Sequence, residues 1–134
     1  MRYRIWTSIL LSGALAACGG DDTVSRGAAL YQQNCALCHG GDLRGGGGAG
    51  IEGLSRTPSD LTVLARDAGS IFPRAEVLTI LESYSLGVQT GRIMRPLTHL
   101  TSEEYKRIKT SAGRARVPAP QAALLAYLES VQSP

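Results

Sequence analysis

The stretch that decides the fold is Cys35-Ala36-Leu37-Cys38-His39, a C-x-x-C-H sequence. This pattern is typical of a c-type haem attachment site. Two thiols three positions apart at the end of a helix can reach the two vinyl groups of one haem, and the next residue then projects its imidazole under the iron. Imidazole is a common axial ligand in haem proteins. We therefore expect Cys35 and Cys38 to attach one haem c covalently and His39 to bind its iron.

Two other kinds of site can be built on a C-x-x-C pair. A thioredoxin-like redox pair belongs to a βαβ unit, and the sequence predicts no such unit. A zinc site needs further ligands, and His99 alone would make a poor fourth ligand beside the first three. The histidine that directly follows the second cysteine favours haem over both.

The N-terminal residues have the pattern of an export signal. Arg2 and Arg4 precede an apolar stretch, residues 5–17, that is too short for a stop-transfer helix. Residues 15–18, Leu-Ala-Ala-Cys, resemble the lipobox of bacterial lipoproteins, which implies cleavage before Cys18 and acylation of that cysteine. Ordinary cleavage with a free Cys18 is the alternative. We expect a protein on the periplasmic side, lipid-anchored to a membrane, with the inner membrane favoured over the outer.

Length and composition predict one small domain that needs a cofactor. The 134 residues include 16 glycines and few aromatic side chains, so a haem would supply apolar volume that the chain lacks. The expected division is a signal peptide at 1–17, a short lipid-anchored tether at 18–25 and a haem domain at 26–134. From Cys18 onward, twelve basic against eleven acidic residues leave a balance of +1, which does not indicate a nucleic-acid partner.

The periodicity of apolar residues predicts an all-α fold with long loops. Ser25 is a candidate N-cap for the first helix, Ser59 for the second, and Pro73 suits the first turn of the third. Thr101 and Glu104 form a possible capping box for a further short turn. No convincing period-2 alternation is present, so no strand is expected. The four longer helices are expected at about residues 26–34, 59–69, 73–87 and 118–131.

From Gly27 to Val131 the chain resembles class I cytochrome c. Gly27, Tyr31 and Cys35 stand four residues apart, as a glycine and an aromatic do before the haem motif in that family, and Leu124 and Tyr127 match its Leu-x-x-Tyr pair in the last helix. The resemblance implies the cytochrome c fold: short helices and long loops wrapped around one covalently bound haem, with the first and last helices crossed.

The resemblance also implies a sixth iron ligand and a partner for the axial histidine. The family commonly uses a methionine followed by proline, and Met94 lies in a loop at the expected place, with Arg95 inserted before Pro96. His99 is the alternative ligand and would give a bis-histidine haem. Pro58 is the candidate for the carbonyl that accepts a hydrogen bond from the axial imidazole, although a helix-entry proline explains it nearly as well.

These features predict an electron-transfer protein rather than an enzyme. We expect a membrane-tethered monohaem cytochrome that carries single electrons between respiratory or periplasmic redox partners, including a role as a subunit or donor of an oxidoreductase. No small-molecule substrate is expected. If Met94 does not bind, an open sixth position would instead fit a haem-based peroxidase or small-ligand sensor. A haem-free lipoprotein that acts as a binding module is the third class.

Overall fold

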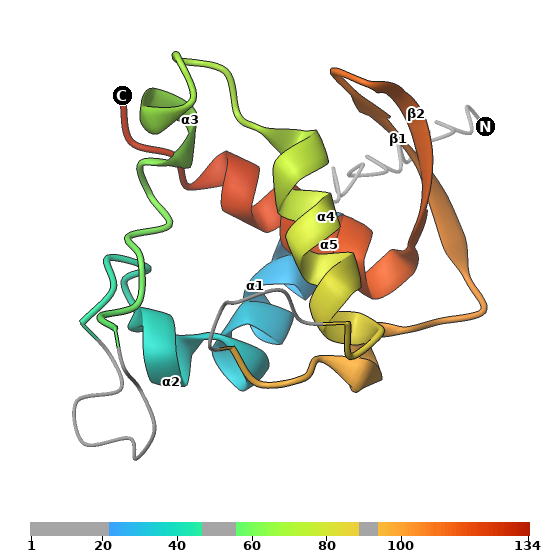
Figure 1. The fold of residues 1–134 in the computed structure, drawn as a ribbon, viewed down its shortest axis with the longest axis horizontal. Coiled ribbons are helices and arrows are strands. Elements are labelled where there is room, and N and C mark those ends of the chain that lie inside the picture. The colour runs from blue at the N-terminus through green and yellow to red at the C-terminus, as the bar shows by residue number, and fades with distance from the viewer. Residues whose placement is uncertain (1–21, 47–55, 89–93) are drawn as a thin grey trace, which may run out of the picture.

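The computed structural model of the protein describes residues 22–46, 56–88 and 94–134. The α1 and α5 helices cross at the centre, α4 lies against α5, and the two strands form a hairpin on the side of the domain remote from α2 (Figure 1). The expected signal peptide and Cys18 lie outside the described residues. In chain order the elements are α1 (Asp22–Asn34), α2 (Ala36–His39), α3 (Leu64–Asp67), α4 (Arg74–Ser85), a 3-10 helix η1 (Thr98–Leu100), β1 (Tyr105–Thr110), β2 (Gly113–Pro118) and α5 (Ala119–Ser130).

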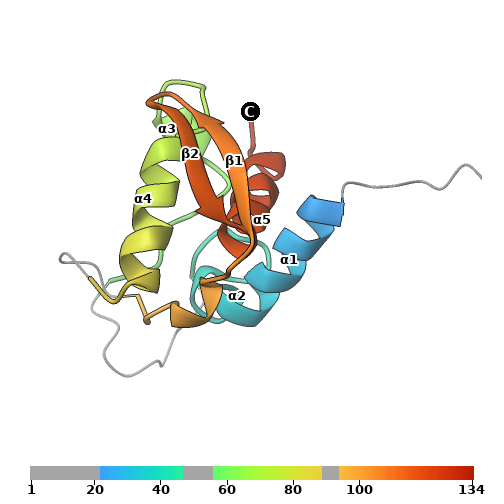
Figure 2. The same cartoon turned by 90° about the vertical axis from the view of Figure 1, so that its right-hand side faces the viewer.

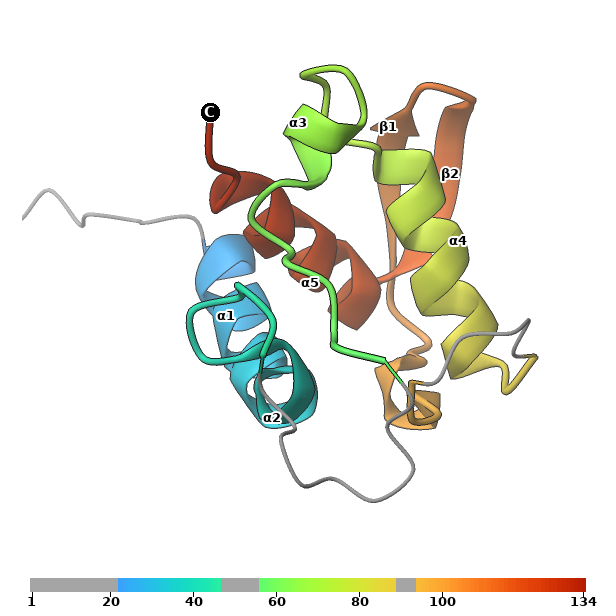
Figure 3. The same cartoon turned by 60° about the vertical axis from the view of Figure 1, so that its left-hand side comes forward.

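The centre of the core is the contact between α1 and α5 (Figure 3). Gly27 is buried at the crossing, where a Cβ would overlap the carbonyl oxygen of Ala123 and lie 2.7 Å from the Cβ of Tyr127. One turn further along α1, Tyr31 is fully buried and its ring centroid lies 5.6 Å from that of Tyr127. The crossing implied by the resemblance to class I cytochrome c is therefore present, and its closeness depends on the absence of a side chain at Gly27.

The α4 helix closes the core from the other side of α5. Its apolar residues recur at helical spacing, so Val77, Leu78 and Leu81 face inward together with Tyr84. The helix begins at Arg74, so Pro73 is its N-cap residue, one position before the first turn in which the sequence predicts it. Arg74 also ties three elements together, because its guanidinium donates to both carboxylate oxygens of Glu129 on α5 and to the carbonyl of Lys109 on β1, at 2.7–3.0 Å.

Two helix starts differ from their predictions. The first helix begins at Asp22, so it is a turn longer than expected, Ser25 lies inside it, and it includes half of the expected tether. The helix expected from Ser59 onward is α3, which begins only at Leu64. It begins later because Asp60 accepts hydrogen bonds from the backbone N–H and the hydroxyl of Thr62, at 2.8 and 2.7 Å, and closes a turn there. These hydrogen bonds lower the pKa of the Asp60 carboxyl below its usual range.

The β1–β2 hairpin contradicts the expectation that no strand forms. Its strands pair antiparallel, with Tyr105 opposite Pro118 and Thr110 opposite Gly113 (Figure 2). The inner face carries only Ile108, Ala115 and the buried Val117 as apolar contacts, while the outer face is charged. The apolar alternation is therefore too weak to predict strands. Thr101 and Glu104 cap no helix; the chain between η1 and β1 is extended or bent there.

Candidate haem site

The C-x-x-C-H motif is held by helical backbone that continues from α1. The N–H of Cys35 donates to the carbonyl of Tyr31 at 2.8 Å, and the N–H of His39 donates to the carbonyl of Cys35 at 2.9 Å. The hydroxyl of Tyr31 also donates to the carbonyl of Gly40, just after the motif, at 2.6 Å. One helical turn therefore separates the thiols of Cys35 and Cys38, and both ends of the motif are fixed to α1.

The imidazole of His39 is oriented by a backbone carbonyl. Its Nδ1 lies 3.0 Å from the carbonyl oxygen of Ser59. Because a carbonyl oxygen can only accept, Nδ1 carries a proton, and in the neutral imidazole the lone pair is then on Nε2. A metal-binding histidine is commonly held in this way by a backbone carbonyl, which fixes the ring and raises its basicity.

The residue that supplies this carbonyl differs from the one expected. The resemblance to class I cytochrome c implies Pro58, whereas the structure places the carbonyl of Ser59, one residue later, against the ring. The carbonyl of Pro58 faces Gly45 instead, so closely that a Cβ on Gly45 would overlap it. Gly45 has a φ of 77°, a conformation that glycine adopts without strain. Pro58 thus lines the site but accepts no hydrogen bond from His39.

One cavity of about 810 Å³ gathers the candidate side chains. Cys35, Cys38, His39 and Met94 all line it, although Met94 is more than fifty residues away in sequence. Most of the remaining wall is formed by apolar side chains for which the sequence motifs predict no role in the site. They come from three segments of the chain, and include Leu61, Leu64, Val77, Ile80, Leu81, Leu124 and Leu128.

Both candidates for the sixth ligand border this cavity, but they differ in burial. Met94 is partly buried and packs against the core, whereas His99, in η1, is exposed. The loop after Met94 is anchored at Leu97, which is buried and whose N–H donates to the carbonyl of Tyr84 at 2.9 Å. Arg95 and Pro96 are exposed between these two points, so the inserted arginine is accommodated at the surface.

The donor set and the lining fit a covalently attached haem. Two thiols, an imidazole with an unprotonated nitrogen and a thioether border a mostly apolar space, and pockets for organic cofactors have this composition. Burial, with a smaller contribution from the neighbouring Cys38, raises the pKa of the Cys35 thiol to about 11. The thiol is therefore neutral at physiological pH and compatible with the apolar wall around it.

Crossed terminal helices, a C-x-x-C-H turn and an apolar cavity with an oriented histidine define a monohaem class I c-type cytochrome domain. A family model described as cytochrome C oxidase, cbb3-type, subunit III matches residues 22–110, and the chain belongs to this family. Searches of curated proteins and of solved structures find no match to the chain.

Membership of the family settles several of the expectations from sequence. The cytochrome c fold is confirmed, with the β1–β2 hairpin as an addition to the predicted helices, and the cofactor is one covalently bound haem c. The protein is a c-type cytochrome involved in electron transfer, which implies redox partner proteins and an extracytoplasmic location in bacteria.

Within the described ranges, the helices are all too short or too polar to cross a membrane.

Proposed function

We propose that this cytochrome carries single electrons between redox partners on the periplasmic side of a bacterial membrane, where acylated Cys18 anchors it. The bound haem supplies an iron centre that changes its oxidation state by one electron. The observation that carries the proposal is the convergence of Cys35, Cys38, His39 and Met94 on one mostly apolar cavity. Such a site suits a fixed redox centre better than it suits a reaction on a substrate.

Each of these residues has a role that its surroundings support. Cys35 and Cys38 form the two thioether bonds to the haem. His39 is the first axial ligand, since its Nδ1 is occupied by the Ser59 carbonyl and its Nε2 is left for iron. Met94 is the sixth ligand, and its partial burial favours it over the exposed His99. A thioether ligand raises the reduction potential relative to a second imidazole.

Absorbance spectra of the oxidised and reduced holoprotein test the ligation. We expect a low-spin wild-type protein with the long-wavelength ferric band given by sulfur–iron ligation. Met94→Ala should lose this band and lower the potential, whereas the matched variant His99→Ala should keep both. A band that survives in Met94→Ala, or that is lost in His99→Ala, contradicts the assignment. A high-spin wild-type spectrum would contradict the carrier function and support a peroxidase or ligand sensor.

The lipid anchor is tested separately on cells that express the full chain. Wild-type protein should stay with the membrane fraction after a high-salt wash and should incorporate labelled fatty acid. Cys18→Ala should incorporate no label and should leave the membranes in high salt. The salt is needed because it screens attraction between exposed charges and a lipid surface, so that only the acyl anchor is measured. A variant that remains bound in high salt contradicts the anchor.

A further inference from the structure

The outer face of the β1–β2 hairpin is a basic ribbon, which we define as Tyr105, Arg107, Lys109, Arg114 and Arg116. All five residues are exposed, and the strand register places them on one face, because residues two apart in a strand and directly opposite in its neighbour point the same way. The face therefore carries four cations and one aromatic ring.

Folding alone gives no reason for this concentration of charge. Arg107 lies directly opposite Arg116, and Lys109 lies directly opposite Arg114. Like charges at such positions destabilise a sheet. Within the described ranges, none of these four cations forms a salt bridge, although the guanidinium of Arg116 lies 4.4 Å from the ring centroid of Tyr105. A surface that costs stability and is not neutralised internally points to an anionic ligand outside the domain.

The hairpin is hydrogen-bonded to the core and lies outside the haem site. Arg74 connects it to α4 and α5 through the carbonyl of Lys109, and the N–H of Ala119 donates to the carbonyl of Glu104 at 2.8 Å. The cavity lining includes no residue of the hairpin. An anionic surface bound by the ribbon would therefore leave the rim of the haem cavity free for redox partners.

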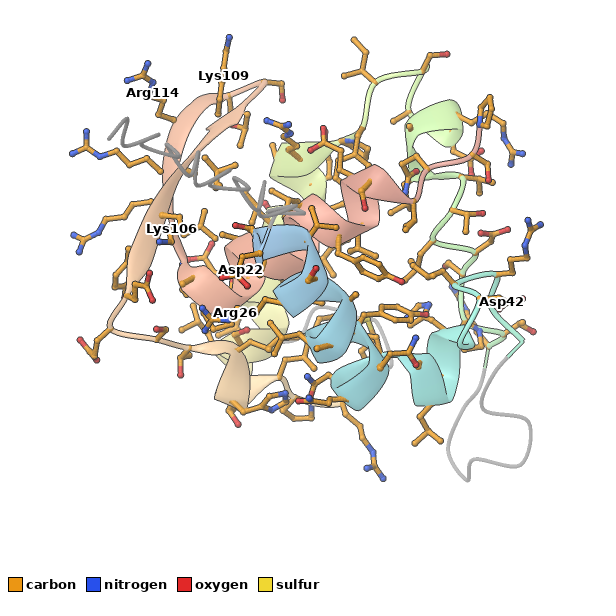
Figure 4. The ribbon with its side chains drawn as sticks, turned by 180° about the vertical axis from the view of Figure 1, so that it is seen from behind. Asp22, Arg26, Asp42, Lys106, Lys109 and Arg114 are labelled. Atoms are coloured by element: carbon orange, nitrogen blue, oxygen red, sulfur yellow. The ribbon has the colours of Figure 1, made fainter. Side chains whose placement is uncertain are left out.

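The start of α1 lies near the base of the hairpin. Figure 4 shows Asp22 and Lys106 on the same side of the domain, with Asp42, which follows the haem motif, on the opposite side. Arg26, one turn into α1, helps to lower the pKa of the Glu104 carboxyl, whose main partner is Lys106. The chain thus enters the domain beside the base of the hairpin that carries the ribbon.

We propose that the basic ribbon lies on an anionic phospholipid surface and orients the cytochrome on its membrane. The proposal rests on the proposed anchor at Cys18 for the nearness of the bilayer. Only three residues separate Cys18 from Asp22, so an extended chain spans at most about 14 Å between them. The bilayer is therefore within reach, and exposed Lys and Arg side chains are attracted to anionic headgroups. Tyr105 adds a ring of the kind that favours the membrane interface.

Sedimentation with lipid vesicles tests the ribbon without the anchor. The haem-loaded Cys18→Ala protein should bind vesicles of phosphatidylcholine mixed with phosphatidylglycerol, bind pure phosphatidylcholine far less, and be released by salt. Each charge removed should weaken binding about fivefold, so Lys109→Gln with Arg114→Gln should weaken it about 25-fold. The matched control, Arg44→Gln with Arg66→Gln, removes the same charge from exposed positions outside the hairpin and should bind nearly as the parent does.

Lysine labelling gives a second readout, because Lys106 and Lys109 are the only lysines in the sequence. Anionic vesicles should protect Lys109, on the outer face, from an amine-reactive reagent more than Lys106, which is on the other face and pairs with Glu104 at 2.7 Å. The Lys109→Gln and Arg114→Gln variant should fold at least as stably as its parent, since it relieves a like-charge pair.

Three results would overturn the proposal: equal binding to both kinds of vesicle, an equal loss in the control variant, or equal labelling of Lys106 and Lys109 on anionic vesicles. Equal binding to both vesicles would leave an acidic protein as the occupant. Failure of the anchor is a different outcome. In that case wild-type protein would leave cell membranes in high salt, while the ribbon would still bind anionic vesicles.

Discussion

Replacing Gly27 with alanine tests whether the α1–α5 crossing is set by backbone contact. The new Cβ would overlap the carbonyl oxygen of Ala123 and lie 2.7 Å from the Cβ of Tyr127. The carbonyl belongs to the backbone of α5, which is buried over most of its length, so it cannot turn aside as a flexible side chain would. The two helices must therefore move apart.

The size of the effect follows from three contributions. Overpacking of a well-packed core costs about 1–3 kcal/mol. Separation of the helices also weakens the Tyr31–Tyr127 contact, and such aromatic pairs contribute about 0.5–1.5 kcal/mol. Alanine is favoured over glycine in a helix interior by roughly 1 kcal/mol, which opposes both losses. We expect Gly27→Ala to lower the free energy of unfolding by about 2 kcal/mol.

Chemical denaturation of the haem-loaded protein measures this change, and the sign of the result is decisive. Ala29→Gly is the matched control, because Ala29 is exposed on the same helix. This variant should lose only the higher helix propensity of alanine, which lowers the free energy of unfolding by roughly 1 kcal/mol. If propensity governed both positions, Gly27→Ala would stabilise the protein. A Gly27→Ala variant as stable as the wild type, or more so, would refute close helix contact as the reason for glycine at this position.

Three further variants test other contacts. Tyr31→Phe removes the hydrogen bond to Gly40 and should cost about 1 kcal/mol at neutral pH in denaturant titrations. Burial raises the pKa of Tyr31 in the folded protein. The wild type therefore loses stability as the pH rises above about 10, where this tyrosine ionises in the unfolded chain. The difference in stability between the wild type and Tyr31→Phe should shrink above that pH. Arg74→Gln breaks the bidentate pair with Glu129; both side chains are more than a third exposed, so a thermal melt should show a loss of only about 1 kcal/mol. Gln132→Ala should cost about 1–2 kcal/mol and speed hydrogen exchange near α3.

The parts of the fold that could be predicted are those with a local signature. The apolar positions of α4 and α5 recur at helical spacing, and the structure has helices close to those bounds. Gly27 and Tyr31, spaced before Cys35 as in class I cytochrome c, carry the resemblance that implies the helix crossing. The C-x-x-C-H motif and the single downstream Met94 predict which side chains border the cavity.

The hairpin could not be predicted because its two faces do not differ in the usual way. Strand prediction depends on alternation between an apolar and a polar face, and here only Val117 is buried on the inner face. The outer face places like charges side by side, with Arg107 opposite Arg116. Such a pattern argues against the pairing of these two segments as strands. The same departure from ordinary sheet chemistry is what points to an external anionic surface.

The carbonyl that orients His39 could not be assigned from sequence for a different reason: a backbone acceptor has no residue type. Which carbonyl meets the ring depends on the path of the chain after residue 56, and distant contacts fix that path. Gln132, beyond α5, donates to the carbonyl of Leu61 at 2.8 Å and accepts from the N–H of Ala65 at 2.9 Å, while the N–H of Ser133 donates to the carbonyl of Thr62 at 2.7 Å.

These contacts tie the position of His39 to the C-terminal end of the domain. The thiols of Cys35 and Cys38 are presented by local helical backbone that continues from α1. The Ser59 carbonyl that meets Nδ1 of His39 instead belongs to a segment held on both sides: the N–H of Leu61 donates to the carbonyl of Leu43, and the carbonyls of residues 61 and 62 accept from Gln132 and Ser133. We therefore expect loosening of the C-terminus to disturb the orientation of His39 before it disturbs the turn that presents the two thiols.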